Sequence, residues 1–233
     1  RQFSYRATSR LKVYIIVQAD RMTVQASNSL LKFLEEPTVP VVAILITENG
    51  HALLPTIQSR AQTIPFHPLS AEEMSRILLG EGHSGTLVGA AVQLASGVAA
   101  ARELIQLNWF AEIRNVMIQL AKESLQRNSA ALLTVHHKVV KTDLMDHVDT
   151  LLDLFVLLFK DLLNVQCGRR DRIVFPDQAD WMAKTAFSRP APYWIRCMDL
   201  ALETKKKIRY HVHPQLALEQ FVIEVQGGEY RSV

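Results

Sequence analysis

Arg60 is the residue in this sequence whose type and setting could do chemistry on an anionic group. It follows Ser59, directly after a segment in which Pro55 favours a short helix. A guanidinium can neutralise negative charge that develops on a phosphate. The alternative is that Arg60 only pairs with a carboxylate at a helix end, and on spacing alone this alternative is favoured.

Histidines and cysteines offer weaker candidates for a site. His136-His137 and the pair His211 and His213 have no cysteine or carboxylate at clear ligand spacing, so we expect them on helix surfaces. Cys167 and Cys197 are too few for a four-cysteine zinc site and are expected to be small packing residues. No Ser/His/Asp, Cys/His or paired-carboxylate constellation is apparent, and no metal site is predicted.

Charge gives little indication of a partner. The net charge of +3 is too small to indicate nucleic acid by itself. The three lysines at 205–207 are expected at a solvated helix end, and the alternative is contact with a neighbour's acidic surface or with DNA phosphate. Residues 169–172, with three arginines and one aspartate, are expected in an exposed loop between helices.

Composition predicts a globular protein. The chain of 233 residues is 48% hydrophobic, which is too apolar for a disordered chain, and its apolar runs are shorter than the ~20 residues that span a bilayer. No segment near Arg1 resembles a secretory signal. We therefore expect a soluble, cytoplasmic protein.

The elements that must position Arg60 follow from the hydropathy pattern. Residues 12–17 and 41–47 are predicted as parallel strands buried on both faces, joined by a helix that Thr23 caps and that ends before Pro37. Residues 62–66 are predicted as a third, short strand. These elements are too few to cover a sheet, so we expect the first part of an α/β domain to precede Arg1.

After Pro68 the pattern is helical throughout. Ser70 and Glu73 form a capping box that opens the first of three short helices, over 70–79, 86–95 and 98–107. Longer helices are predicted at 109–126, 149–166, 194–208 and 214–227, and the second of them is expected to be buried almost all round.

Three strings of residues carry a resemblance to a known family. Residues 12–22, the string Asn-Ser-Leu-Leu-Lys-Phe-Leu-Glu-Glu-Pro at 28–37, and Leu-Pro-Thr-Ile-Gln-Ser-Arg-Ala at 54–61 resemble the clamp-loader family of AAA+ proteins, and within it the delta-prime subunit type of bacterial DNA polymerase III. The resemblance extends over the whole chain. It implies an α/β partial P-loop (AAA+-type) domain at 1–67, an all-α lid at 68–107 and an all-α collar or oligomerisation domain at 108–233.

The resemblance also shows which catalytic groups this sequence lacks. Hydrolysing relatives place an Asp-Glu pair at the end of the strand that matches 12–17, and here these positions are Val17 and Gln18. Valine cannot coordinate Mg²⁺, and a neutral amide cannot accept a proton from water. The position of the phosphate-sensing arginine of the lid is Ala100, and Arg102 lies about 200° further round the helix. We therefore expect a subunit that does not hydrolyse ATP.

The same resemblance favours a catalytic role for Arg60 over a simple ion pair at a helix end. In this family the matching Ser-Arg-Cys motif projects its arginine into the ATP site of the adjacent subunit, so Arg60, with Ser59, is expected to be an arginine finger that acts in trans. Ala61 replaces the usual cysteine. Thr47 matches the polar sensor near the γ-phosphate and is a weak candidate, because threonine commonly ends a strand. Asp20 is expected to be a surface or turn residue rather than a metal ligand.

The resemblance implies a clamp-loader subunit of the replicative DNA polymerase III. Its partners would be the tau/gamma ATPase subunits and the delta subunit, and the assembly would load the β sliding clamp onto primed DNA. No cofactor is expected in this chain, and ATP and Mg²⁺ are expected in neighbouring subunits. Many relatives have a four-cysteine zinc module in the part that would precede Arg1. Two alternatives stay open: an ATP-hydrolysing tau/gamma-type subunit, and a helical scaffold or DNA-binding protein derived from AAA+ ATPases.

Overall fold

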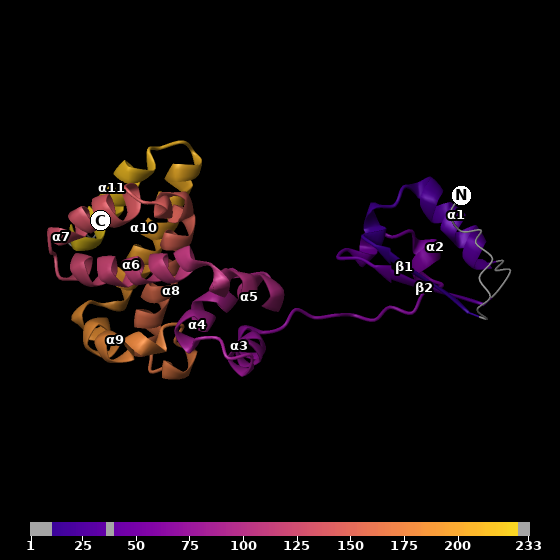
Figure 1. Ribbon diagram of the computed structural model, residues 1–233, viewed down its shortest axis with the longest axis horizontal. Helices are drawn as coiled ribbons and strands as arrows, with labels where there is room; N and C mark the ends of the chain where they lie inside the picture. The colour runs from indigo at the N-terminus through magenta and orange to yellow at the C-terminus, as the bar shows by residue number, and fades with distance from the viewer. Residues whose placement is uncertain (1–10, 36–39, 228–233) are drawn as a thin grey trace. The chain divides into compact units, whose positions relative to one another are not determined.

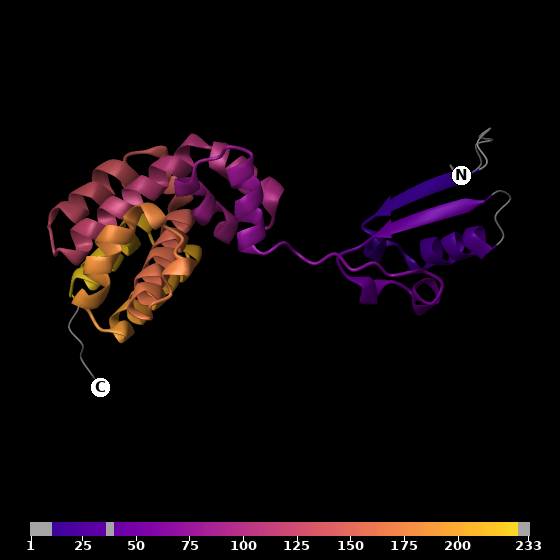
Figure 2. The same ribbon diagram turned by 90° about the horizontal axis from the view of Figure 1, so that it is seen from below.

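The computed structural model describes residues 11–35 and 40–227 (Figures 1 and 2). The chain divides into two compact units, Arg1–His67 and Pro68–Val233. The first contains a small parallel sheet and the second is helical. In the described ranges no helix combines the length and the apolar character needed to cross a bilayer.

The first unit is built on a strand–helix–strand crossover. Strands β1 (Lys12–Val17) and β2 (Val41–Ile46) are parallel, with Lys12 opposite Val41 and Val17 opposite Ile46. Between them in sequence lies helix α1 (Val24–Glu35), and the Thr23 hydroxyl oxygen accepts a hydrogen bond from the backbone N–H of Ala26 at 3.2 Å. The predicted parallel unit and its cap are confirmed.

The expectation that both strands are buried on both faces is wrong for the described residues. Exposure alternates along each strand, and Val13, Ile15 and Val17 are all more than half exposed. The ring of Tyr14 packs edge-on against Phe33 of α1 at 5.3 Å between centroids, so α1 covers the face to which Tyr14 belongs. Because successive side chains point to opposite faces, one helix on one face leaves the other face open.

The predicted third strand at 62–66 is also wrong. These residues have no regular structure, and Ile64 and Phe66 are 67% and 92% exposed. A short extended stretch becomes a strand only when a neighbouring edge accepts its hydrogen bonds, and in the part of the chain that the structure describes β1 pairs only with β2.

The second unit begins with three short helices, α3 (Ala71–Gly80), α4 (Gly85–Leu94) and α5 (Val98–Gln106). The predicted capping box is present: the N–H of Glu73 donates to the Ser70 hydroxyl, and the Glu73 carboxylate accepts from the Ser70 N–H. Buried side chains such as Leu78, Val88 and Ala101 join these helices to the core of the remaining helices.

Four long helices complete this unit: α6 (Asn108–Leu125), α8 (Val148–Gln166), α10 (Ala191–Arg209) and α11 (Pro214–Gly227). Helix α8 is buried on most of its surface, as predicted, and Phe155 and Phe159 stack within it. Three further elements were not predicted from the sequence: α7 (Ala130–Thr134), the π-helical turn Val135–Val140 that continues it, and α9 (Ala179–Thr185).

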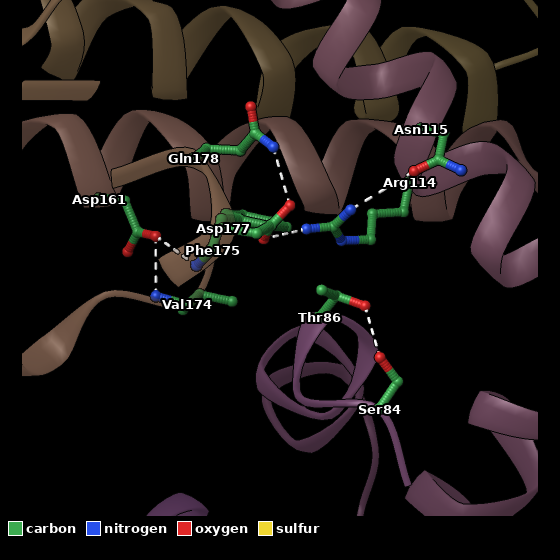
Figure 3. A network of polar contacts seen from close by, with 9 residues as sticks. All are labelled: Ser84, Thr86, Arg114, Asn115, Asp161, Val174, Phe175, Asp177 and Gln178. Atoms are coloured by element: carbon green, nitrogen blue, oxygen red, sulfur yellow. Dashed lines mark hydrogen bonds and ion pairs between the residues drawn. The ribbon is translucent and has the colours of Figure 1, made fainter. Parts of the chain in front are cut away.

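Residues 173–178, here called the strap, lie between α8 and α9 in the sequence and contact both short and long helices (Figure 3). The Asp161 carboxylate of α8 accepts hydrogen bonds from the backbone N–H groups of Val174 (2.7 Å) and Phe175 (2.9 Å), and Arg114 of α6 forms an ion pair with Asp177. On the other side, a Cβ added to Gly89 of α4 would lie 2.3 Å from the Val174 carbonyl oxygen. The strap is therefore in close contact with α4, α6 and α8, and the expected boundary at 107/108 lies inside this compact unit.

The two cysteines differ from each other. Cys197 is buried, as expected, and burial raises the pKa of its thiol to about 12. Cys167 is exposed at the end of α8, so the expectation that it packs in the core is wrong: the helix ends at Gln166 and the chain turns away from the core there.

Candidate functional site

The segment that carries Arg60 is a short, well-anchored turn of helix. Helix α2 (Pro55–Gln58) begins with Pro55 at its first position, and its residue Ile57 is buried. The Gln58 side-chain amide donates to the Leu53 carbonyl at 2.8 Å, which ties the end of the helix to the segment before it. The backbone N–H of Arg60 donates to the Ile57 carbonyl at 3.1 Å. The backbone of Arg60 is therefore held while its side chain extends to the surface of the unit.

The Arg60 guanidinium has two partners in its own unit. Its Nη2 lies 3.1 Å from Oε1 of Glu35, the last residue of α1, and its Nη1 donates to the Thr56 carbonyl oxygen at 3.2 Å. The ion pair that the spacing favoured is therefore present. The Arg60 and Glu35 side chains remain 55% and 48% exposed, so the guanidinium is accessible to a further anion.

The carboxyl ends of β1 and β2 bring together two residues that are 27 positions apart in the sequence. Asp20 lies in a 3-10 turn after β1, as expected of a turn residue, and its Oδ1 accepts a hydrogen bond from Thr47 Oγ1 at 2.9 Å. The N–H of Asn49 donates to the same Thr47 oxygen at 3.1 Å. A signal for this contact existed, since parallel strands place the residues that follow them at one edge of the sheet.

Two of the three positions expected to lack catalytic groups, Val17 and Ala100, are exposed. Val17 ends β1 with an exposed side chain, and Gln18 has a left-handed backbone conformation with φ of 56°. Ala100 is exposed on α5. Arg102 does not replace it, because its Nε and Nη2 donate to the two carboxylate oxygens of Glu81 at 2.8 and 2.6 Å.

The basic segments at 205–207 and 169–172 differ in their surroundings. Lys205 lies 2.5 Å from Asp153 of α8 and its side chain is 17% exposed, so the expectation of a solvated end is wrong for this lysine, because α10 packs along α8. Residues 170–172 form an exposed turn, as expected. In the described segments no three His, Cys, Asp or Glu side chains are grouped to hold a metal.

Comparison with known proteins gives a consistent family. A family model described as "DNA polymerase III, delta subunit" matches residues 1–70. The chain is 34% identical to DNA polymerase III subunit delta' of Bacillus subtilis over 225 residues, which cover 94% of this chain and 67% of that protein. It is 36% identical over 78 residues to DNA polymerase III subunit gamma/tau of Mycobacterium tuberculosis, covering 34% of this chain and 14% of that protein.

Among solved structures, the Bacillus subtilis DNA clamp loader delta protein (YqeN) matches with a TM-score of 0.41 and 12% identity, over 95% of this chain and 79% of that one. A likeness at that level adds nothing to the sequence relationship. The identity to the delta' subunit extends over nearly all of this chain and two thirds of that relative. The chain therefore belongs to the DNA polymerase III delta' subunit family.

Proposed function

We propose that this clamp-loader subunit works without hydrolysing ATP and that Arg60 acts in trans on ATP bound by a neighbouring subunit. The observation that carries the proposal is the setting of Arg60: its backbone is fixed at the end of α2 while its guanidinium is half exposed and held by an exposed ion pair. Such pairs contribute about 0–1 kcal/mol, so a highly charged phosphate can compete for the guanidinium.

The lack of hydrolysis by this chain is supported by its own side chains. Val17 has no group that can hold Mg²⁺, and the neutral amide of Gln18 cannot take a proton from water. The hydroxyl of Thr47, the sensor candidate, donates its hydrogen bond to Asp20. A carboxylate beside that hydroxyl would also repel a γ-phosphate.

In this proposal residues 1–67 are the second half of an AAA+-type domain, residues 68–107 are the lid and residues 108–233 are the collar. The subunit would assemble with tau/gamma and delta subunits, which would hold ATP and Mg²⁺, and the assembly would place the β clamp on primed DNA. Similarity to both delta' and gamma/tau proteins supports this placement.

The test is Arg60→Ala in the reconstituted clamp loader, with single-turnover ATP hydrolysis measured in the presence of clamp and primed DNA. Arginine fingers are worth about 10³–10⁵ in rate at the site they serve, so we expect hydrolysis at one neighbouring site to be lost while the complex still assembles. Arg76→Ala is the matched control, because Arg76 is an exposed arginine in a weak pair with Glu72 at 3.8 Å. An unchanged hydrolysis rate for Arg60→Ala would show that Arg60 is structural.

A further inference from the structure

The ion pair between Arg60 and Glu35 bears on how the proposed finger is controlled. Glu35 is the last residue of α1, and Arg60 follows α2, so two elements separated by a strand in the sequence hold the guanidinium jointly. Each holds it with one contact, from Nη2 to the carboxylate at 3.1 Å and from Nη1 to the Thr56 carbonyl at 3.2 Å. The contact to Glu35 is a single one, not the bidentate contact that makes guanidinium–carboxylate pairs strong.

The place of Glu35 on its helix explains why the pair forms. The carboxyl-terminal end of a helix carries a partial negative charge, so a carboxylate there is disfavoured and a cation close to it is favoured. Arg60 supplies that cation. The pair therefore stabilises the end of α1 slightly and gives the guanidinium a resting position in its own unit.

We infer that Glu35 is a positioning residue for Arg60. Its carboxylate holds the guanidinium against the end of α1, an arrangement here called the parked position. The γ-phosphate of a neighbouring subunit's ATP must displace this carboxylate before it can bind Arg60. This inference rests on the proposed function of Arg60. One guanidinium edge cannot serve the Glu35 carboxylate and a phosphate at the same time, so the two anions compete. Because both side chains are about half exposed, solvent screens the pair and the contact can open readily.

The expected effect is modest and has a definite sign. Exposed ion pairs shift an equilibrium by about two- to fivefold, so removing the competing carboxylate should raise the availability of the finger by that factor. Glu35→Gln removes the charge and keeps the size of the side chain. We expect it to raise the single-turnover rate of ATP hydrolysis in the assembled clamp loader about two- to fivefold, without changing assembly.

The experiment compares four versions of the complete complex: unmodified, Glu35→Gln, Arg60→Ala, and the double variant. The double variant should match Arg60→Ala, because a parked position has no effect without the side chain that it holds. Glu72→Gln is the matched control, since it removes an exposed carboxylate from another ion pair, and its rate should be unchanged.

The outcomes separate the two proposals. If Arg60→Ala leaves hydrolysis unchanged, the finger assignment itself fails. If Arg60→Ala lowers hydrolysis but Glu35→Gln leaves it equal or lowers it, the finger stands and the parked position is overturned. A rate increase in the double variant relative to Arg60→Ala would also overturn it, because Glu35 would then act through some other group.

Discussion

Replacing Asp161 by asparagine should remove a defined part of the pH dependence of stability in the helical unit. Asp161 is fully buried in α8, and its Oδ2 accepts hydrogen bonds from two backbone N–H groups of the strap. Its Oδ1 is buried without a hydrogen-bond partner among the described residues. Burial raises the pKa of the carboxyl from 3.8 to about 6, although the N–H groups of Phe175 and Val174 and the charge of Lys160 lower it in part.

The sign follows from proton linkage. The folded state holds the Asp161 proton more tightly than the unfolded state, so the stabilisation is fully present below about pH 3.8 and is lost as the pH rises through about 6. A shift of roughly two pKa units corresponds to about 3 kcal/mol in total. About 2 kcal/mol of this should appear between roughly pH 7.5 and pH 4.5.

The assay is urea unfolding of the chain and of Asp161→Asn at several pH values, followed by tryptophan fluorescence. Trp109, Trp181 and Trp194 are the three tryptophans of the sequence, and all lie in the helical unit, so the signal reports that unit alone. The free energy of unfolding of the unmodified chain minus that of the variant should rise by about 2 kcal/mol from pH 7.5 to pH 4.5. Because the other titrating groups are the same in both proteins, their contributions to the free energy of unfolding cancel in this difference.

A matched control is Asp177→Asn, in the same strap. Burial acts to raise the pKa of Asp177, but hydrogen bonds from Arg114 and Gln178 outweigh it and lower the pKa. Asp177 therefore contributes stability that is lost as the pH falls, and its difference should move in the opposite direction. A difference for Asp161 that is constant with pH would refute the reasoning, and one that falls toward low pH would show that hydrogen bonding outweighs burial there.

Two further predictions concern stability. Gly89→Ala should destabilise the helical unit by about 2 kcal/mol or more in the same urea assay, because the added Cβ meets the backbone of the strap. Gly80 has open space around it, so the control Gly80→Ala should be neutral or slightly stabilising. Tyr193→Phe should lower the free energy of unfolding by about 1–2 kcal/mol, as measured by thermal unfolding. The Tyr193 hydroxyl donates a hydrogen bond to the Val225 carbonyl near the end of α11 at 2.6 Å, and phenylalanine cannot replace it. A melting curve that Tyr193→Phe leaves unchanged would mean that this carbonyl finds another donor.

Local pattern was enough for most of the elements. The capping box at Ser70, the cap at Thr23 and the burial of α8 on most of its surface each follow from one short stretch of sequence, and each was predicted. Helices α7 and α9 were missed because five and seven residues are too few to show a helical period. The strand expected at 62–66 did not form, because in the described residues no partner strand pairs with it and Pro65 has no backbone N–H to donate.

By itself, the sequence determined which side chains are available for chemistry. Val17, Gln18 and Ala100 have neither a carboxylate nor a guanidinium whatever the fold, and Arg60 is recognisable as a candidate from the residues around it. Only the tertiary structure decided what these side chains touch. The contacts of Arg60 with Glu35, Thr47 with Asp20 and Asp161 with the strap join residues 13 to 27 positions apart. Such contacts depend on how the strands and helices pack, and no local propensity encodes that packing.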